Sequence, residues 1–155
     1  MVFKIKEVNN EEVNIVDQLL TKLIIDEGKS YDENINLEYK VEGFYQKYLG
    51  NEDMKILVAV DDKGSIIGYL FGFIENNGKV YRNSVAKIDA LYVEQFYRGY
   101  GIAKELVNYF EKWCKVKTIM YIEIDVCKEN AIAYNMYKQK GFSPFRINMR
   151  KKIKK

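Results

Sequence analysis

A nearly continuous run of apolar residues over Ile66–Ile74 limits the folds open to this 155-residue chain. Such a run is typical of a central β-strand covered on both faces, because a strand with one face in solvent alternates apolar and polar residues. Strands are also predicted over Lys55–Val60 and Val80–Val93, joined by the turn sequences Asp61-Asp62-Lys63-Gly64 and Asn76-Asn77-Gly78-Lys79. We therefore expect these three strands to pair in antiparallel fashion.

The other elements are predicted from periodicity and from residues that favour helix ends. A short strand over Phe3–Glu7 precedes a helix that Asn9 or Asn10 can cap. Together they predict an α+β fold in the order β-α-α-β-β-β-α-β-α-β, forming a single domain over residues 1–155. The remaining predictions are helices with apolar stripes over Val13–Ile24, Leu37–Tyr48 (ended by Gly50), Ile102–Trp113 and Asn130–Lys140 (closed by Gly141), and strands over Ile119–Val126 and Phe145–Met149.

Composition removes several classes of protein. The chain has no histidine and two cysteines, Cys114 and Cys127, so a zinc site, a histidine-based catalytic triad and a disulfide framework are not expected. No apolar run approaches the roughly 18 residues of a membrane span, and the first six residues do not resemble a secretion signal. We therefore expect a soluble, cytoplasmic protein without a membrane partner and without a metal.

The charge is unevenly distributed along the chain. The net charge is +3, but the basic tail over Arg150–Lys155 carries five positive charges, so residues 1–149 have a net charge of −2. Residues 1–53 alone contain twelve acidic and six basic residues. This imbalance favours a cationic partner for the first third of the chain.

A glycine-containing segment follows the strand that ends at Leu91-Tyr92-Val93. The segment Arg98-Gly99-Tyr100-Gly101-Ile102-Ala103 opens an amphipathic helix. Glycines let the backbone approach a ligand, and the first turn of a helix presents unpaired N–H groups at the positive end of its dipole. The segment is either an anion site suited to phosphate oxygens or a plain tight turn. It lacks the third glycine of a dinucleotide fold and the Gly-Lys-Ser/Thr of a nucleotide triphosphatase.

Two motifs resemble those of the GNAT superfamily of acyl-CoA-dependent N-acyltransferases. The family pattern Arg/Gln-x-x-Gly-x-Gly/Ala matches Arg98, Gly101 and Ala103. The family pattern Asn-x-x-Ala-x-x-x-Tyr-x-x-x-Gly-Phe is matched by Asn130, Ala133, Tyr137, Gly141 and Phe142. The resemblance is strongest over Ile88–Phe142, and the predicted element order is compatible with the family fold, a mixed, mostly antiparallel sheet flanked by helices.

The resemblance implies acetyl-CoA as the cosubstrate. The strands before and after the glycine-containing segment would splay apart, and backbone at Leu91, Tyr92 and Val93 would contact the pantetheine arm. The diphosphate would rest on Arg98, Gly99, Tyr100, Gly101, Ile102 and Ala103. Asn130 would contact the cofactor arm, although an asparagine at a helix start also serves as a cap.

The resemblance also implies catalytic roles. Tyr137 would be the general acid that protonates the departing sulfur; the alternative is a core aromatic. Asp89 would accept the amine proton directly or through water, since burial would raise its pKa; the alternative is an exposed strand residue paired with Lys87 or another basic residue. Backbone N–H near Leu91 or Tyr92 would stabilise the oxyanion. The rival bases, Glu123 and Asp125, lie on the strand over Ile119–Val126.

We therefore expect an N-acetyltransferase that moves an acetyl group from acetyl-CoA to a primary amine of a small cationic molecule or peptide by direct attack. The alternative is a non-catalytic module that senses acyl-CoA or binds nucleic acid through the tail Arg150–Lys155. That tail has no interleaved aromatic residues, so we expect no nucleic-acid partner. The sequence does not decide the acceptor, and it is compatible with a homodimer.

Overall fold

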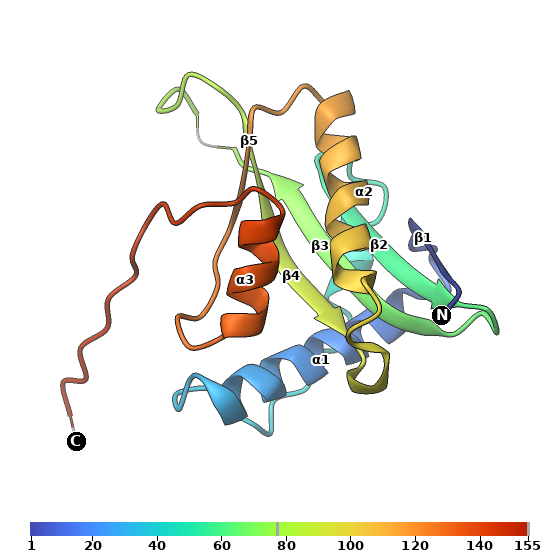
Figure 1. The fold of residues 1–155 in the computed structure, drawn as a ribbon, viewed down its shortest axis with the longest axis horizontal. Coiled ribbons are helices and arrows are strands. Elements are labelled where there is room, and N and C mark those ends of the chain that lie inside the picture. Colours follow the sequence, from blue (N-terminus) through green and yellow to red (C-terminus); the bar gives the residue numbers. More distant parts are fainter. Residues whose placement is uncertain (77, 155) are drawn as a thin grey trace. The chain divides into compact units, whose positions relative to one another are not determined.

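The protein is built on one five-stranded sheet in the order β1-β2-β3-β4-β5 (Figure 1). The computed structural model describes residues 1–76 and 78–154. The strands are β1 (Phe3–Glu7), β2 (Met54–Asp61), β3 (Ile66–Ile74), β4 (Val85–Val93) and β5 (Tyr121–Ile124), the helices are α1 (Val13–Ser30), α2 (Ile102–Val116) and α3 (Ala131–Gln139), and two short 3-10 helices are η1 (Tyr45–Tyr48) and η2 (Gln95–Tyr97).

Contacts divide the chain into two compact units. The first, Met1–Asp125, contains the whole sheet together with α1 and α2. The second, Val126–Lys155, contains α3 and the residues that follow it. A single domain over the whole chain, as expected from the sequence, stays a prediction.

The sheet confirms the predicted α+β class and its mostly antiparallel pairing. β1, β2, β3 and β4 pair successively in antiparallel fashion, and β5 joins β4 in parallel. The central β3 matches the predicted Ile66–Ile74. Two strands are shorter than predicted: β4 begins at Val85 instead of Val80, and β5 covers only Tyr121–Ile124.

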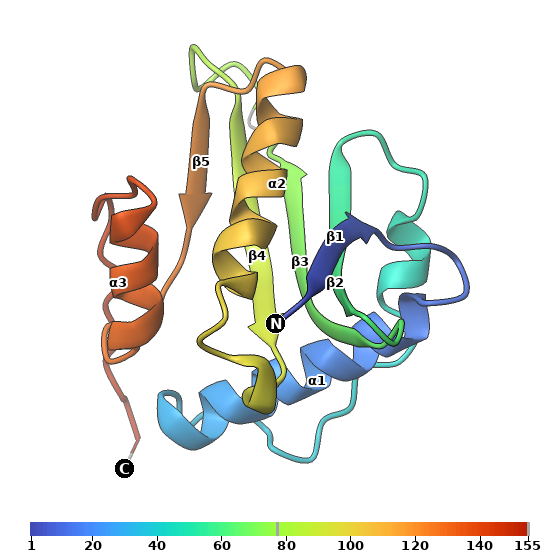
Figure 2. The ribbon, with the colours of Figure 1, turned by 45° about the vertical axis from the view of Figure 1, so that its right-hand side comes forward.

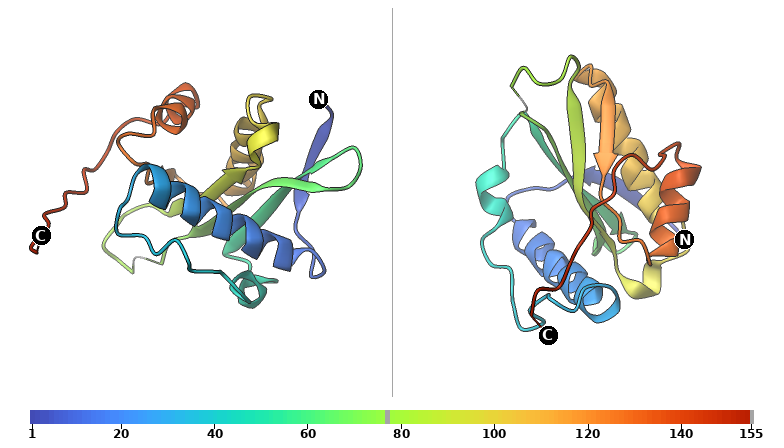
Figure 3. Two further views of the ribbon diagram at one scale, coloured as in Figure 1. Left: turned by 90° about the horizontal axis from the view of Figure 1, so that it is seen from below. Right: turned by 90° about the vertical axis from the view of Figure 1, so that its left-hand side faces the viewer.

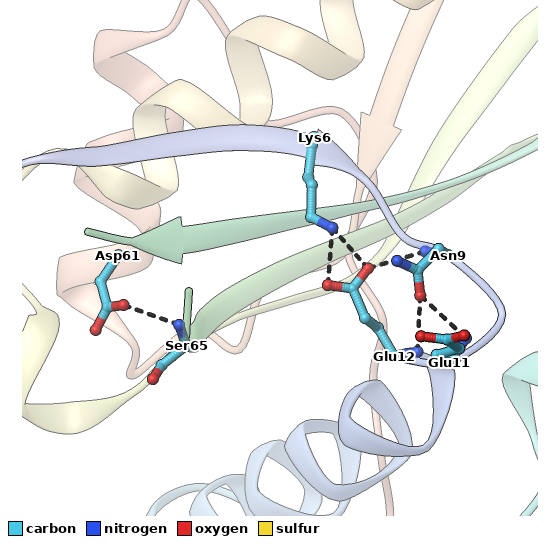
Figure 4. Close-up of polar contacts among 6 residues, drawn as sticks. All are labelled: Lys6, Asn9, Glu11, Glu12, Asp61 and Ser65. Carbon is cyan, nitrogen blue, oxygen red and sulfur yellow. Dashed lines mark hydrogen bonds and ion pairs between the residues drawn. The ribbon is translucent and has the colours of Figure 1, made fainter. Parts of the chain in front are cut away.

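The turn between β2 and β3 forms as the sequence predicts. The carboxylate of Asp61 accepts hydrogen bonds from the backbone N–H groups of Lys63 and Ser65 at 3.0 and 2.9 Å (Figure 4). Gly64 has a φ of +85°, a conformation that glycine adopts without steric cost. In the second predicted turn, Asn76-Asn77-Gly78-Lys79, Asn77 lies outside the described residues.

The prediction that Asn9 or Asn10 caps the first helix is wrong, because α1 begins after Glu12 and the N-cap position has no side-chain capping bond. Asn9 instead begins the turn that leads into α1. Its side-chain oxygen accepts hydrogen bonds from the backbone N–H groups of Glu11 and Glu12, each at 3.0 Å (Figure 4). The Glu12 carboxylate in turn accepts a hydrogen bond of 3.1 Å from the backbone N–H of Asn9, and it forms an ion pair with Lys6. This reciprocal arrangement satisfies backbone donors of the turn that precedes α1.

Helices cover both faces of the sheet, as the apolar central strand requires (Figures 2 and 3). On one face, α1 and η1 pack over β2, β3 and β4 in a cluster of twelve buried residues. On the other face, α2 buries a stripe that includes Leu106, Val107 and Phe110. The cluster of the first face consists of Val8, Val13, Val16, Leu19, Tyr45, Ile56, Val58, Val60, Tyr69, Phe71, Ala90 and Tyr92.

The predicted second helix over Leu37–Tyr48 is wrong, because only Tyr45–Tyr48 is helical, as a 3-10 turn. Gly43 has a φ of +64°, which interrupts an α-helix. The backbone N–H groups of Val41 and Tyr45 donate to the side chains of Thr21 and Asp17 on α1. The apolar residues in this stretch therefore pack as an irregular segment held by α1.

The predicted last strand over Phe145–Met149 is also wrong: these residues form neither a helix nor a strand. Their apolar side chains alternate as in a strand, but the described part of the chain gives them no paired strand. A strand is defined by its neighbour as well as by its own sequence, because its backbone N–H and C=O groups need partners. The preceding helix was predicted correctly, and Gly141 after it has a φ of +92°.

Gly72 fits where it stands because α2 crosses it closely. A Cβ atom built on Gly72 would lie 2.3 Å from a ring atom of Phe110 and 2.9 Å from the carbonyl oxygen of Lys87. Gly72 pairs with Ile88 in β4. The absence of a side chain at this position thus lets the Phe110 ring rest directly on the sheet.

Replacement of Gly72 by alanine should therefore destabilise the protein by about 2 kcal/mol, because overpacking forces the ring or the backbone to move. Denaturant unfolding measures this change. Phe110→Leu should cost less in the Gly72→Ala background than in the wild type, since the smaller side chain relieves the clash. Additive effects of the two substitutions would contradict the proposed contact.

Candidate functional site

The parallel pairing of β4 and β5 stops halfway along β4. The paired positions run from Val85 opposite Tyr121 to Ile88 opposite Ile124. β4 continues to Val93, still paired with β3 on its other side. Over residues 89–93, the edge of β4 that faces away from β3 therefore has no strand partner in the described part of the chain (Figure 2).

A β-bulge lies at the point where this pairing stops. Phe71 pairs with Ala90 and Gly72 pairs with Ile88, so Asp89 is an extra residue without a partner on β3. Ile88 shares the α2 face with Gly72, whereas Ala90 belongs to the cluster under α1. A bulge changes the alternation of side chains between the two faces of the sheet, and it increases the local twist. Asp89 therefore lies where β4 changes direction.

Alternation along β4 shows which backbone groups face the unpaired edge. The N–H of Glu94 donates to the carbonyl of Ile67, and the carbonyl of Tyr92 lies against Gly68, so both residues turn toward β3. Neighbouring residues of a strand direct their N–H and C=O groups to opposite edges. Leu91 and Val93 therefore direct theirs to the unpaired edge, which favours Leu91 over Tyr92 as a backbone donor.

The glycine-containing segment forms an open turn at the start of α2. Gly99 and Gly101 have φ values of +86° and +84°, and a Cβ atom at either position would meet nothing within 4 Å. Gly101 directly precedes α2, whose first residue, Ile102, is buried, while residues 98–101 are exposed. The N–H groups of the first helical turn are thus reached from solvent, as an anion site requires.

Arg98 holds the end of β4 as well as bordering this turn. Its Nε donates to the carbonyl oxygen of Val93 at 2.8 Å, and its guanidinium forms an ion pair with Asp26 of α1 at 3.2 Å. The guanidinium also lies over the ring of Tyr92. If Arg98 binds a diphosphate, as the sequence predicts, it does so with a side chain that already contacts Val93, Asp26 and Tyr92.

The environment of Asp89 changes the acidity of its carboxyl group. Partial burial raises the pKa of Asp89 above its ordinary value; the charge of Lys87 lowers this pKa and that of Asp125 raises it. The side chain remains accessible to solvent. Its charge also raises the pKa of Tyr45 and Tyr69, which lie in the cluster under α1.

The rival bases are placed differently. Asp125 forms an ion pair with Lys87 at 2.9 Å. Asp89 is exposed and lies within reach of the charge of Lys87, so the alternative interpretation of Asp89 stays open. Glu123 lies opposite Lys87 in the β4–β5 register. Both rival acids are therefore close to the positive charge of Lys87.

Asn130 and Tyr137 belong to the second unit and are described within it. The side-chain oxygen of Asn130 accepts the backbone N–H of Ala133 at 3.2 Å, so Asn130 caps α3. Tyr137 is the buried residue of α3, and its ring contacts that of Phe142 edge to face. Burial raises the pKa of the Tyr137 phenol, so it keeps its proton at neutral pH.

Two features next to the site were not predicted. On α1, Lys22 and Asp26 form ion pairs with Glu94 at 2.6 Å and Arg98 at 3.2 Å, and so join α1 to the segment between β4 and α2. The spacing of four residues, which places Lys22 and Asp26 on one helix face, was the available signal. The second feature, described next, lies in the cluster under α1.

A buried polar group lies within the cluster under α1. The hydroxyl groups of Tyr45 and Tyr69 share a hydrogen bond of 3.0 Å, and Asp17, only 3% exposed, accepts the backbone N–H of Tyr45 at 3.1 Å. Burial raises the pKa of both phenols. Nothing in the local sequence pairs these residues, which come from α1, η1 and β3.

The described residues suit a thioester carrier with a phosphate group. The open glycine turn and the first turn of α2 offer N–H groups to a diphosphate, and the unpaired edge at Leu91 and Val93 offers backbone groups to the amides of a flexible arm. Among the described residues, no group of three or more Cys, Asp or Glu side chains is arranged to hold a metal ion. No helix in the described ranges is long and apolar enough to cross a membrane.

A family model described as acetyltransferase (GNAT) matches residues 20–142, most of the chain and both motifs. The chain belongs to the GNAT family. The resemblance that its two motifs indicated is thereby confirmed, and so is the prediction that the chain is an acetyltransferase of this family.

Relatives and solved structures agree with this assignment. N-alpha-acetyltransferase 20 of Dictyostelium discoideum is 31% identical over 118 residues, which cover 73% of this chain and 66% of that protein. The BH1408 protein of Bacillus halodurans has a TM-score of 0.85 at 21% identity, covering 97% of this chain and 99% of that chain. The AAC(6')-Iy structure, in complex with the bisubstrate analogue CoA-S-monomethyl-acetylneamine, has a TM-score of 0.69 at 21% identity and covers 98% and 99%.

Proposed function

We propose that this GNAT protein transfers an acetyl group from acetyl-CoA to a primary amine by direct attack. The single observation that carries the proposal is the end of the β4–β5 pairing beside an open glycine turn, because it leaves backbone donors and acceptors facing a place where no strand lies. Acetyl-CoA would supply the activated acetyl group. The structure of AAC(6')-Iy with a CoA-linked analogue supports this choice of donor by similarity of fold.

The glycine turn and the β4 edge would hold the donor. We assign the diphosphate to Arg98, Gly99, Tyr100, Gly101, Ile102 and Ala103, with the arm along Leu91, Tyr92 and Val93. Since Leu91 directs its N–H to the unpaired edge, it would be the donor that stabilises the developing oxyanion. Asn130 would add a contact to the arm through the side-chain amide that its capping bond does not use.

Asp89 would remove the proton from the attacking amine, directly or through a water molecule. An alkylammonium has a pKa of about 10.4 and cannot attack while protonated. A carboxylate with a raised pKa is a stronger base than an ordinary one. The raised pKa of Asp89 therefore suits this role, and Asp89 lies at the point where the unpaired edge of β4 begins.

Tyr137 would protonate the thiolate that leaves. Its phenol is held in the protonated form by burial, so a proton is available at the moment when negative charge develops on sulfur. The match of α3 to the family motif supports the assignment, with Asn130 and Gly141 at the predicted ends of the helix.

The acceptor would be a cationic small molecule or the N-terminus of a peptide. The excess of acidic residues in the first 53 positions supports a cationic acceptor, although Glu7, Glu12 and Asp26 are already in ion pairs. The name of the Dictyostelium relative supports a peptide N-terminus. Neither cysteine is in a disulfide, which fits the cytoplasmic location that we propose.

Acetyl-CoA binding can be tested with two glycines of matched conformation. Gly101→Ala should weaken acetyl-CoA binding about tenfold in calorimetry, because a side chain at a φ of +84° distorts the N–H groups that meet the diphosphate. Gly64→Ala places the same strain in the β2–β3 turn and is the control. Equal affinity of Gly101→Ala and wild type, or an equal loss in Gly64→Ala, would contradict the diphosphate site.

The base can be tested through the pH dependence of kcat/KM. Activity should fall toward low pH as Asp89 becomes protonated, at a pH above the ordinary Asp pKa of about 3.9. Asp89→Asn should lower activity and remove this acidic limb. Lys87→Gln should move the limb to higher pH because a charge that lowers the pKa of Asp89 is lost. Lys4→Gln, at an exposed residue of β1, is the control and should leave the pH profile unchanged. An acidic limb that persists in Asp89→Asn would show that another group is the base.

The acid can be tested by comparing two tyrosines of α3. Tyr137→Phe should reduce kcat by about a hundredfold with little change in acetyl-CoA affinity, because only proton donation to sulfur is lost. Tyr134→Phe, on the same helix, should leave kcat unchanged. Steady-state kinetics and calorimetry on both variants measure the difference. A Tyr137→Phe enzyme with wild-type kcat would remove Tyr137 from the mechanism.

A further inference from the structure

The end of the sheet opposite the glycine turn exposes large aliphatic side chains. Val80, Val116 and Met120 are 81%, 82% and 60% exposed. Val80 lies between β3 and β4, Val116 is the last residue of α2, and Met120 directly precedes β5. Single apolar residues are ordinary on a protein surface, but several of them at one end of a sheet mark a candidate contact surface.

Two hydrogen bonds join the segments that carry these side chains. The backbone N–H of Tyr121 donates to the carbonyl oxygen of Ser84 at 3.3 Å, and the Ser84 hydroxyl donates to the carbonyl oxygen of Thr118 at 3.5 Å. Figures 1 and 2 show the β3–β4 connection and the end of α2 at the same end of the sheet. Residues 78–84 and 115–120 therefore form one surface, which we call the sheet-end surface.

Basic residues alternate with the aliphatic ones on the sheet-end surface. Lys79 and Arg82 lie on either side of Val80, and Lys115 and Lys117 lie on either side of Val116. The two segments contain no acidic residue. None of the four basic side chains forms an ion pair with another described residue. The sheet-end surface therefore combines exposed apolar side chains with positive charge.

We propose that the sheet-end surface attaches the protein to a membrane that contains anionic lipids. Aliphatic side chains enter the boundary between headgroups and acyl chains, while Lys and Arg bind the negatively charged headgroups. The expectation of no membrane partner rested on the lack of a spanning segment and of a secretion signal. Attachment through surface loops requires neither of them.

The chemistry of the surface favours a lipid over a nucleic acid. Its most exposed side chains are aliphatic, and acyl chains can bury them. Single-stranded nucleic acids instead stack their bases on aromatic rings. Residues 78–84 and 115–120 contain one aromatic side chain, Tyr81, which is 42% exposed. Positive charge between the aliphatic side chains in turn favours anionic over neutral lipids.

Attachment at this end leaves the candidate site open. β4 begins beside the sheet-end surface at Val85 and ends at Val93, and α2 begins after Gly101 and ends at Val116. A strand of nine residues is roughly 27 Å long, so the glycine turn lies well away from the membrane. The attachment does not depend on the proposed activity, and its test therefore uses no acetyl-CoA.

Co-sedimentation of the full chain with vesicles measures the attachment. The probes are vesicles of phosphatidylcholine alone and of phosphatidylcholine with about 30% phosphatidylserine, an anionic lipid. The partition coefficient should be at least about tenfold higher with phosphatidylserine, and it should fall as salt is added, because dissolved ions screen the attraction.

A pair of valines at opposite ends of the sheet tests the apolar contact. Val116→Asp should lower the partition coefficient about tenfold, because a charge replaces an aliphatic side chain at the lipid boundary. Val2, 75% exposed, precedes the end of β1 that pairs with Asp61, at the other end of the sheet. Val2→Asp is therefore the matched control and should leave vesicle binding unchanged.

A pair of double variants tests the charge contact. Lys79→Glu/Lys115→Glu should lower the partition coefficient for phosphatidylserine vesicles about a hundredfold, because two attractive charges become repulsive. Lys4→Glu/Lys63→Glu changes the net charge equally at the other end of the sheet and should lower it less than about threefold. Circular dichroism and thermal melting show whether each variant folds.

Three results would overturn the proposal: equal binding to both kinds of vesicle, wild-type binding by Val116→Asp, or equal losses in the two double variants. Polyuridylate RNA provides a further comparison. Binding of the wild type to this RNA but not to the vesicles, with loss of RNA binding in Lys79→Glu/Lys115→Glu, would assign the surface to nucleic acid and also overturn the proposal.

Discussion

One extra residue in β4 determines how the candidate site is built. Before Asp89, β4 is paired on both sides; after it, β4 is paired only with β3. The bulge adds twist, and the parallel neighbour β5 ends its pairing at the same level. The backbone of Leu91 and Val93 is left facing the unpaired edge as a result. A strand that continued its pairing to Val93 would have no backbone groups to offer a ligand.

The layers on either side of the sheet hold this irregular point in place. On the α2 face, the Phe110 ring rests on Gly72, directly opposite the residue before the bulge. On the α1 face, the hydroxyl pair of Tyr45 and Tyr69 lies in an otherwise apolar cluster. Partial burial at this point disfavours the charged form of the Asp89 carboxyl group and so raises its pKa.

The sequence predicts those parts of the fold that depend on local pattern. The apolar run of β3, the Asp61–Gly64 turn and the Gly141 helix end each follow from residues close together in the chain. The predicted helix over Leu37–Tyr48 failed because Thr21 and Asp17, far away in sequence, take the backbone N–H groups that a helix would use. Tertiary partners outweighed local periodicity there.

The candidate site shows the same division. The glycine turn and its helix are visible in the motif around Arg98, but the bulge at Asp89 depends on a register with β3 that one strand's sequence does not specify. The contacts of Arg98 with Val93 and Asp26 likewise connect segments that only folding brings together. A binding site formed by one loop can therefore be predicted from the sequence, whereas the parts of the site that depend on contacts between β3, β4 and α1 cannot.

The two ion pairs from α1 have a consequence for how this protein responds to its surroundings. Lys22–Glu94 and Asp26–Arg98 are partly or largely solvent-exposed, so dissolved salt weakens both. Both ion pairs connect α1 to the segment between β4 and α2. Raising the ionic strength should therefore weaken the attachment of α1 to that segment, while the apolar packing on the two faces of the sheet stays unchanged.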